Sequence, residues 1–223
     1  MTATAATPVS PAPAPPRPVG GILLEGVAWS TYVRLSRDLE RAGSKAQLVY
    51  IEGRLGIVSP RLPEHERMKS ILGRFVEIIS LELDIPIATL GESTWRRKKL
   101  GKGCEPDECY YIQHEPQIAG RTKINLKKDP PPDLIIEVEI THDPLEKFPV
   151  YAALGVPEIW HYHRTRLRCL HLARDGSYEE AEKSLVFPFL RPAEMNRFLD
   201  MLSSEGEHAV VRAFRDWVRA LPR

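Results

Sequence analysis

The sequence has few cysteines, almost no net charge and no long apolar run, and each of these features excludes a class of protein. Its three cysteines, Cys104, Cys109 and Cys169, are odd in number and lack metal-ligand spacing. They argue against a disulfide framework and a cysteine-bound zinc, and they favour a reducing compartment. The formal net charge is +1, so the overall charge of the chain does not favour nucleic-acid binding, and any basic surface must be local. No apolar run is long enough to span a membrane, and we expect a cytoplasmic protein without a membrane partner.

The first 20 residues, MTATAATPVSPAPAPPRPVG, are rich in proline and alanine and almost free of charge. They lack the basic start and apolar centre of a signal peptide. A segment of this composition cannot bury enough apolar surface to offset its ordering entropy. We therefore predict a disordered tail over residues 1–20 and a single domain over residues 21–223, a length that suits one well-packed core.

Apolar periodicity predicts a mixed α/β order with one long helix ahead of most of the strands. Residues 63–83 carry apolar side chains at helical spacing, the strongest such pattern in the chain. A shorter helix is expected over residues 29–43, with its cap near Ser30 or Thr31, and a hairpin over residues 47–60. The other expected elements are strands within 85–89, 93–97, 108–112 and 177–185, a helical turn at 149–155, a hairpin of 158–163 with 167–173, and two helices within 193–219.

The segment DLIIEVEI, residues 133–140, should be a buried strand, yet it contains three carboxylates. Side chains alternate along a strand, so Asp133, Glu137 and Glu139 share one face with Ile135. Carboxylates persist in apolar surroundings when they are paired or bound to metal. Upstream, Asp107 follows a proline in GCEPDECYYI, just before another expected strand. An aspartate and a glutamate on neighbouring strands could hold one hard divalent cation such as Mg²⁺ or Mn²⁺.

A plainer interpretation remains open for these carboxylates. Asp107 could be a turn residue, and Glu137 and Glu139 could face solvent, because a motif of two acidic residues is a weak signal. Asp133 follows three prolines and suits a turn, so we assign it no chemical role. His65 leans toward the buried side of the long helix and is a site candidate, although a lone histidine there is more often a core residue. His161 and His163 lack further ligands at suitable spacing, so no zinc site is expected.

Two segments, GCEPDECYYI and PPPDLIIEVEITHDPLEKFPVYAALGVPEIWHYH, resemble the Uma-two family of restriction-endonuclease-like proteins, part of the PD-(D/E)XK nuclease superfamily. The resemblance covers roughly residues 22–200. It implies an α/β fold with a restriction-endonuclease-like mixed sheet of four or five strands flanked by helices, here with an N-terminal helix plus hairpin and C-terminal helices. It also implies that Asp107 and Glu137 bind metal. Glu139 stands where the superfamily has lysine, and we assign it as a further ligand or water-positioning base.

Lys147 is our candidate to replace the missing lysine. Pro149 disfavours helical angles at Phe148, so we expect the helix to begin at Pro149 and leave Lys147 on the connection, free to fold back over Glu137 and Glu139. Relatives tend to carry a basic residue at this place, as the resemblance suggests. The alternative is a surface lysine paired with Glu146 or solvent.

The densest basic run precedes Asp107 and is our candidate for phosphate contacts with DNA. It comprises Arg96, Arg97, Lys98, Lys99 and Lys102. The ordinary interpretation of such a run is a solvated surface. The leading hypothesis is a Mg²⁺-dependent endonuclease that hydrolyses DNA phosphodiester bonds, with a homodimer left open. The alternative is a catalytically inactive nuclease-fold module that binds nucleic acid or a protein partner, and a glycoside hydrolase ranks last.

Overall fold

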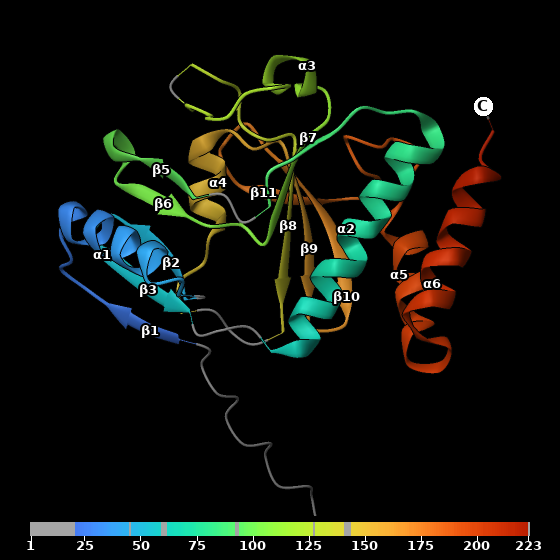
Figure 1. The fold of residues 1–223 in the computed structure, drawn as a ribbon, viewed down its shortest axis with the longest axis horizontal. Helices are drawn as coiled ribbons and strands as arrows, with labels where there is room; N and C mark the ends of the chain where they lie inside the picture. Colours follow the sequence, from blue (N-terminus) through green and yellow to red (C-terminus); the bar gives the residue numbers. More distant parts are fainter. Residues whose placement is uncertain are drawn as a thin grey trace, which may run out of the picture.

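The computed structural model describes residues 21–44, 46–58, 62–91, 94–126, 128–140 and 144–222. The predicted disordered tail, residues 1–20, lies outside this part of the chain. The described residues form two β-sheets and six α-helices in a mixed α/β order, which agrees with the predicted restriction-endonuclease-like fold (Figure 1).

The larger sheet has six strands in the order β11-β10-β9-β8-β7-β4. Only β8 and β9 pair in parallel among its described ladders, and helix α4 connects them as a crossover. The resemblance implied four or five strands, and that number is wrong for this sheet. The bounds are β4 Ala88–Thr89, β7 Glu108–Tyr111, β8 Leu134–Glu139, β9 Glu158–His163, β10 Arg166–Leu172, β11 Tyr178–Ala181 and α4 Phe148–Leu154.

The smaller sheet has five strands in the order β1-β3-β2-β6-β5, paired in antiparallel fashion. Helix α1 covers it, and Tyr32 from this helix packs with Leu48, Tyr50 and Leu55. The predicted hairpin is β2 and β3, whereas β1 and β6 were not expected because each is too short to show a clear alternation. The bounds are β1 Gly21–Leu24, α1 Trp29–Arg41, β2 Gln47–Ile51, β3 Arg54–Val58, β5 Trp95–Arg97 and β6 Lys102–Cys104.

Strand β8 separates two apolar cores, which explains its unusual sequence. Leu134, Ile136 and Val138 point into a core shared with helices α2, α5 and α6, whereas Ile135 points into a second core shared with α4. Figure 1 shows α2 and α4 on opposite sides of β8. Glu137 continues the face of Ile135, as the alternation predicts, and therefore lies on the α4 side. The bounds are α2 Pro63–Leu83, α5 Pro192–Asp200 and α6 Leu202–Arg219, with a short α3 at Glu115–Ile118 and a 3-10 turn at Lys98–Leu100.

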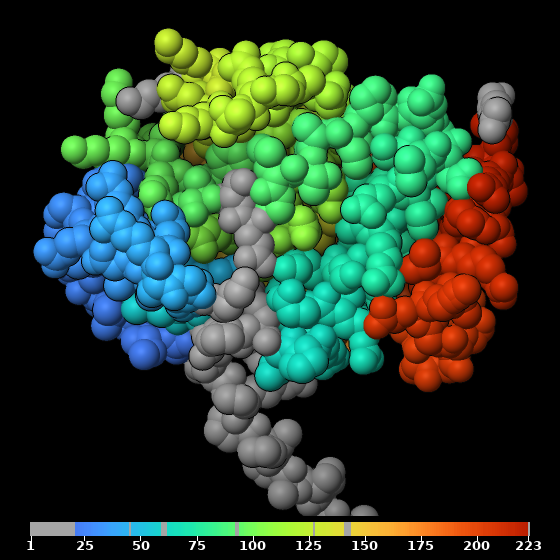
Figure 2. Space-filling model, viewed as in Figure 1, coloured from blue at the N-terminus to red at the C-terminus, as the bar shows by residue number. Residues whose placement is uncertain are grey.

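The long helix and the C-terminal pair are confirmed, and two helix starts need correction. Helix α1 has Ala28 as its N-cap, not Ser30 or Thr31. Helix α4 begins at Phe148 rather than Pro149, with Lys147 as the N-cap. Figure 2 shows helix α1 and the C-terminal helices α5 and α6 on opposite sides of α2. Among the described helices none is both long enough and apolar enough to cross a membrane.

Candidate active site

Asp107 lies in the interior, immediately before β7, and is fully buried. Its Oδ2 accepts a hydrogen bond from the backbone N–H of Val138 at 2.8 Å, which ties it to the neighbouring strand β8. The Nε2 of His65, from the first turn of α2, lies 3.0 Å from the same oxygen. Asp107 therefore lies on a bend, as the plainer interpretation held, but it is buried and fixed by these contacts. His65 therefore touches the predicted site rather than only filling a core position.

Glu137 is also buried, and the α4 side supplies its partners. Lys147 Nζ donates to Glu137 Oε2 at 2.9 Å and to the backbone carbonyl of Glu105 at 2.9 Å. The Tyr151 hydroxyl, one helical turn further on, donates to Glu137 Oε1. Burial, with the nearby Cys104 and Glu137, raises the pKa of Tyr151 well above its ordinary value, so the phenol keeps its proton for this bond. Tyr151 escaped sequence reasoning because its spacing looks like that of an ordinary core residue.

Lys147 folds back over Glu137, one of the two carboxylates that it was predicted to cover, whereas the hydrogen bonds of Glu139 described below are to histidines. The side chain of Lys147 is only 3% exposed, and its Nζ also lies 3.9 Å from Asp107 Oδ1. The alternative, a surface lysine paired with Glu146 or solvent, is wrong. Two carboxylates, one from the bend before β7 and one from β8, thus converge on one positive charge. This convergence offsets part of the cost of burying them.

The donor set of this cluster fits a hard divalent cation. Asp107 and Glu137 already place carboxylate oxygens within 4 Å of a single cationic atom, the Lys147 ammonium nitrogen. Mg²⁺ and Mn²⁺ prefer such oxygen ligands, usually one or two carboxylates completed by water or phosphate. The residues present therefore suit the metal that the sequence predicts.

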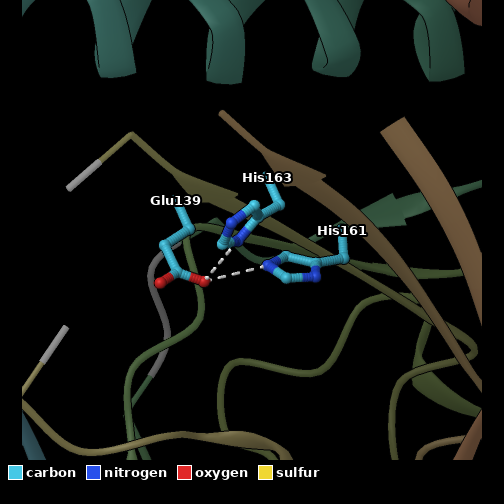
Figure 3. Close-up of side chains that lie close together, drawn as sticks. All are labelled: Glu139, His161 and His163. Atoms are coloured by element: carbon cyan, nitrogen blue, oxygen red, sulfur yellow. Dashed lines mark hydrogen bonds and ion pairs between the residues drawn. The ribbon is translucent and has the colours of Figure 1, made fainter. Parts of the chain in front are cut away.

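Glu139 has different partners from Glu137, although both lie on the same face of β8. Its Oε2 lies 3.2 Å from His161 Nε2 and 3.1 Å from His163 Nδ1, on the adjacent parallel strand β9 (Figure 3). Burial alone would raise the pKa of Glu139, but hydrogen bonds and charge from the two histidines outweigh it and lower the pKa to about 2. The expectation that these histidines lack a third ligand is wrong, because Glu139 and the two rings form a group that could hold a metal ion.

A pocket of about 630 Å³ joins these groups to solvent. Glu137, Glu139 and Lys147 line it, together with His161 and His163 of β9. Asp107 is fully buried and is not part of this lining. A ligand in the pocket would therefore meet Glu137, Glu139 and Lys147 directly.

Some residues of the predicted basic run contact other parts of the protein, and others are exposed to solvent. Arg96 Nη2 pairs with Glu40 Oε1 at 2.7 Å on helix α1. Arg97 donates to the carbonyl of Ala153, and Lys102 to the carbonyl of Pro149 at the start of α4. Lys98 and Lys99 are exposed on the 3-10 turn.

Asp133 has the structural role that a position before the strand suggests. Its Oδ2 accepts hydrogen bonds from the backbone N–H groups of Ile112 and His114, at 2.7 Å and 2.9 Å. Its Oδ1 lies 2.5 Å from the His114 ring. Asp133 therefore fixes the loop after β7 and stays out of the carboxylate cluster.

The model of the Uma2 family, described as "Putative restriction endonuclease", matches residues 29–201. This span contains every residue of the cluster described above and agrees with the extent of the resemblance found in the sequence. No curated protein matches the chain.

Proposed function

This chain belongs to the Uma2 family, and from that premise we propose that it is a metal-dependent endonuclease hydrolysing DNA phosphodiester bonds. The observation that carries the proposal is the convergence of Asp107 and Glu137 on Lys147, with Glu137 and Lys147 lining a solvent-open pocket. The family supplies the nuclease class, and the cluster supplies residues suited to that chemistry.

Asp107 and Glu137 would hold the divalent cation, Mg²⁺ or Mn²⁺. When bound, such a cation supplies Lewis-acid polarisation of a phosphate and lowers the pKa of a bound water. Asp107 is fixed for this role by the backbone of Val138 and by His65, and Glu137 by Tyr151. His65 and Tyr151 are therefore positioning residues, because they act through the two carboxylates.

Lys147 carries the positive charge that the superfamily motif places at residue 139. Its ammonium group is held against Glu137 and lines the pocket in which a phosphate would bind. A fixed cation at this position stabilises negative charge that develops on a phosphodiester during hydrolysis. The departure at residue 139 is thus compensated by a lysine that follows it in the chain, so it does not by itself favour the inactive alternative.

Glu139 keeps a secondary role in the proposal, as a water-positioning base or an additional ligand. Its carboxylate lines the same pocket as Glu137 but contacts His161 and His163. The proposal therefore rests first on Asp107 and Glu137, and an active Glu139→Gln variant would leave it intact.

DNA contact is assigned to the exposed part of the basic run, Lys98 and Lys99, with Lys102 beside the pocket wall at Pro149. Such contacts follow the phosphate backbone without reading sequence. The proposal also places the protein in the reducing cytoplasm, because its three cysteines are buried and form no disulfide.

The test is cleavage of supercoiled plasmid DNA by tag-free protein with Mg²⁺, with Mn²⁺ and with EDTA. We expect nicking or cutting with either metal, none with EDTA, and a loss of about 100-fold or more in Glu137→Gln. Glu179→Gln, an exposed glutamate on β11, is the matched control and should cut like the wild type. Equal cleavage by wild type and a folded Glu137→Gln would refute the assignment. Metal-independent DNA binding without cleavage would support the inactive module.

A further inference from the structure

We infer that Glu139, His161 and His163 form a second metal site, selective for a borderline transition-metal ion such as Zn²⁺ rather than Mg²⁺. The inference does not depend on the proposed nuclease activity, because it uses neither Asp107 nor Glu137. It assigns the histidine pair of β9 a chemistry that the carboxylate and lysine cluster leaves unused.

The ligand atoms already stand at distances close to those of a metal site. His161 Nε2 and His163 Nδ1 lie 3.2 Å and 3.1 Å from the same oxygen, Glu139 Oε2. Ligands about 2.0–2.1 Å from a tetrahedral Zn²⁺ stand roughly 3.3 Å apart. The three ligand atoms lie within 4.8 Å of one another, so a cation could enter with small side-chain movements.

The sheet fixes these side chains in place. Glu139 and His163 are register partners on the parallel strands β8 and β9, and His161 shares their face two residues earlier. The His161 ring packs edge-on against Phe148, with centroids 4.9 Å apart, and against His163 at 5.5 Å. Figure 3 shows both rings directed at the carboxylate from one side. A site built on two strands is held more precisely than one built on loops.

The site is open on one side. The side chain of His161 is 6% exposed, whereas those of His163 and Glu139 are 35% and 24% exposed, and all three line the pocket that contains Glu137. Two histidines and one glutamate with an open position are the ligand set of several catalytic zinc sites, whereas structural zinc is closed by four protein ligands. A metal held here would leave coordination positions for water or a pocket ligand.

The choice of ion follows from the ligands. Imidazole nitrogen suits Zn²⁺, Co²⁺ and Ni²⁺, whereas Mg²⁺ strongly prefers oxygen ligands. We therefore expect the oxygen donors of Asp107 and Glu137 to bind Mg²⁺. The group of Glu139 with two histidine nitrogens should instead bind Zn²⁺, Co²⁺ or Ni²⁺.

Arg168 sets the affinity of this site. Its Nη2 lies 3.0 Å from His161 Nδ1, and because arginine can only donate, Nδ1 must accept and Nε2 carries the proton toward Glu139. A metal at Nε2 needs the opposite tautomer, with Nδ1–H donating and Arg168 withdrawn. An acceptor in place of Arg168 would favour that tautomer, as the outer hydrogen-bond partners of metal-bound histidines do. Arg168→Gln should therefore strengthen metal binding.

The experiment is calorimetric titration of tag-free, chelator-treated protein with Zn²⁺ in excess Mg²⁺, with X-ray absorption of the bound Zn²⁺ to count imidazole ligands. We expect one Zn²⁺ with two imidazoles in the wild type. Glu139→Gln and His163→Ala should each lower the affinity by about 100-fold, and Arg168→Gln should raise it about 10-fold. His208→Ala, an exposed histidine of α6, and Arg166→Gln, an exposed arginine of β10, are the matched controls and should change nothing.

Glu137→Gln separates this inference from the proposed function, because it removes the oxygen site and should leave Zn²⁺ binding unchanged. The inference is overturned if the wild type binds no Zn²⁺, if the bound ion lacks two imidazoles, or if folded Glu139→Gln and His163→Ala both bind like the wild type. Unchanged affinity in Arg168→Gln would overturn the role of Arg168.

Discussion

Replacing Lys147 with methionine tests the electrostatics of the candidate site most sharply. Methionine keeps most of the buried length of the side chain and removes only its charge and donors. The change leaves Glu137 without its 2.9 Å ion pair and Asp107 without the positive charge 3.9 Å away. Asp107 would keep its hydrogen bond from Val138 and Glu137 its hydrogen bond from Tyr151, but both buried carboxylates would lose the positive charge that they share.

The expected loss of stability is large. Removing one partner of a buried ion pair typically costs about 3–5 kcal/mol, because the remaining charge stays buried. Lys147 is 3% exposed at its side chain and Asp107 is fully buried, so solvent cannot replace the lost contact. Lys99→Met, at an exposed lysine, is the control and should stay within about 0.5 kcal/mol of the wild type.

Urea denaturation of metal-free protein near neutral pH measures the effect. Glu137→Gln combined with Lys147→Met should recover much of the loss, since no unpaired lysine or glutamate then remains. The metal-free Lys147→Met protein should also bind Mg²⁺ more tightly than the wild type, because a competing cation has left the two carboxylates, while turnover falls about 100-fold. A loss below about 1 kcal/mol, or single-variant effects that simply add in the double variant, would refute this reasoning.

Three further predictions concern the surroundings of the site. His65→Ala should lower the free energy of unfolding by about 1–3 kcal/mol, because a buried carboxylate loses a donor, and His65→Gln should restore part of it; equal midpoints in urea for all three proteins would contradict this. The carboxyl of Glu139 has its pKa lowered from 4.5 to about 2, so in metal-free protein its stabilisation is present above pH 4.5 and is lost as the pH falls toward 2. The difference in unfolding free energy between wild type and Glu139→Gln should shrink over that interval, and a constant difference would contradict it. Neutralising Lys98 and Lys99 should reduce the salt dependence of DNA binding by about one counterion for each lost contact, whereas Arg96→Gln, which removes a partner of helix α1, should leave the salt slope unchanged.

The parts of the fold with strong local patterns were predictable from the sequence. The helix over residues 63–83 has the bounds that its apolar spacing predicts, and the hairpin at Glu52 and Gly53 forms as its turn residues indicate. Strands β1 and β6, with four and three residues, were not predicted from the sequence, because their pairing depends on neighbours distant in the chain. The full size of the smaller sheet, to which both strands belong, therefore escaped prediction.

The candidate site likewise has features that follow from local sequence patterns and others that depend on contacts between distant segments. Alternation along β8 places Glu137 and Glu139 on one face, and the start of α4 at Phe148 leaves Lys147 at the N-cap, close enough to reach Glu137. The sequence could not show that Glu139 contacts two histidines, because that contact depends on the parallel register of β8 and β9. The sequence also could not show which of the basic residues are paired with other parts of the protein. Arg96, for example, pairs with Glu40 on α1, which is far away in the chain.

Calorimetric titration with Mg²⁺ tests the central claim, that Asp107 and Glu137 form one divalent-cation site. We predict a single binding event in the wild type, its loss in Asp107→Asn and in Glu137→Gln, and its retention in Glu139→Gln. Circular dichroism establishes that each variant is folded. Mg²⁺ binding that persists in both folded carboxylate variants, or that is absent from the wild type, would contradict the claim.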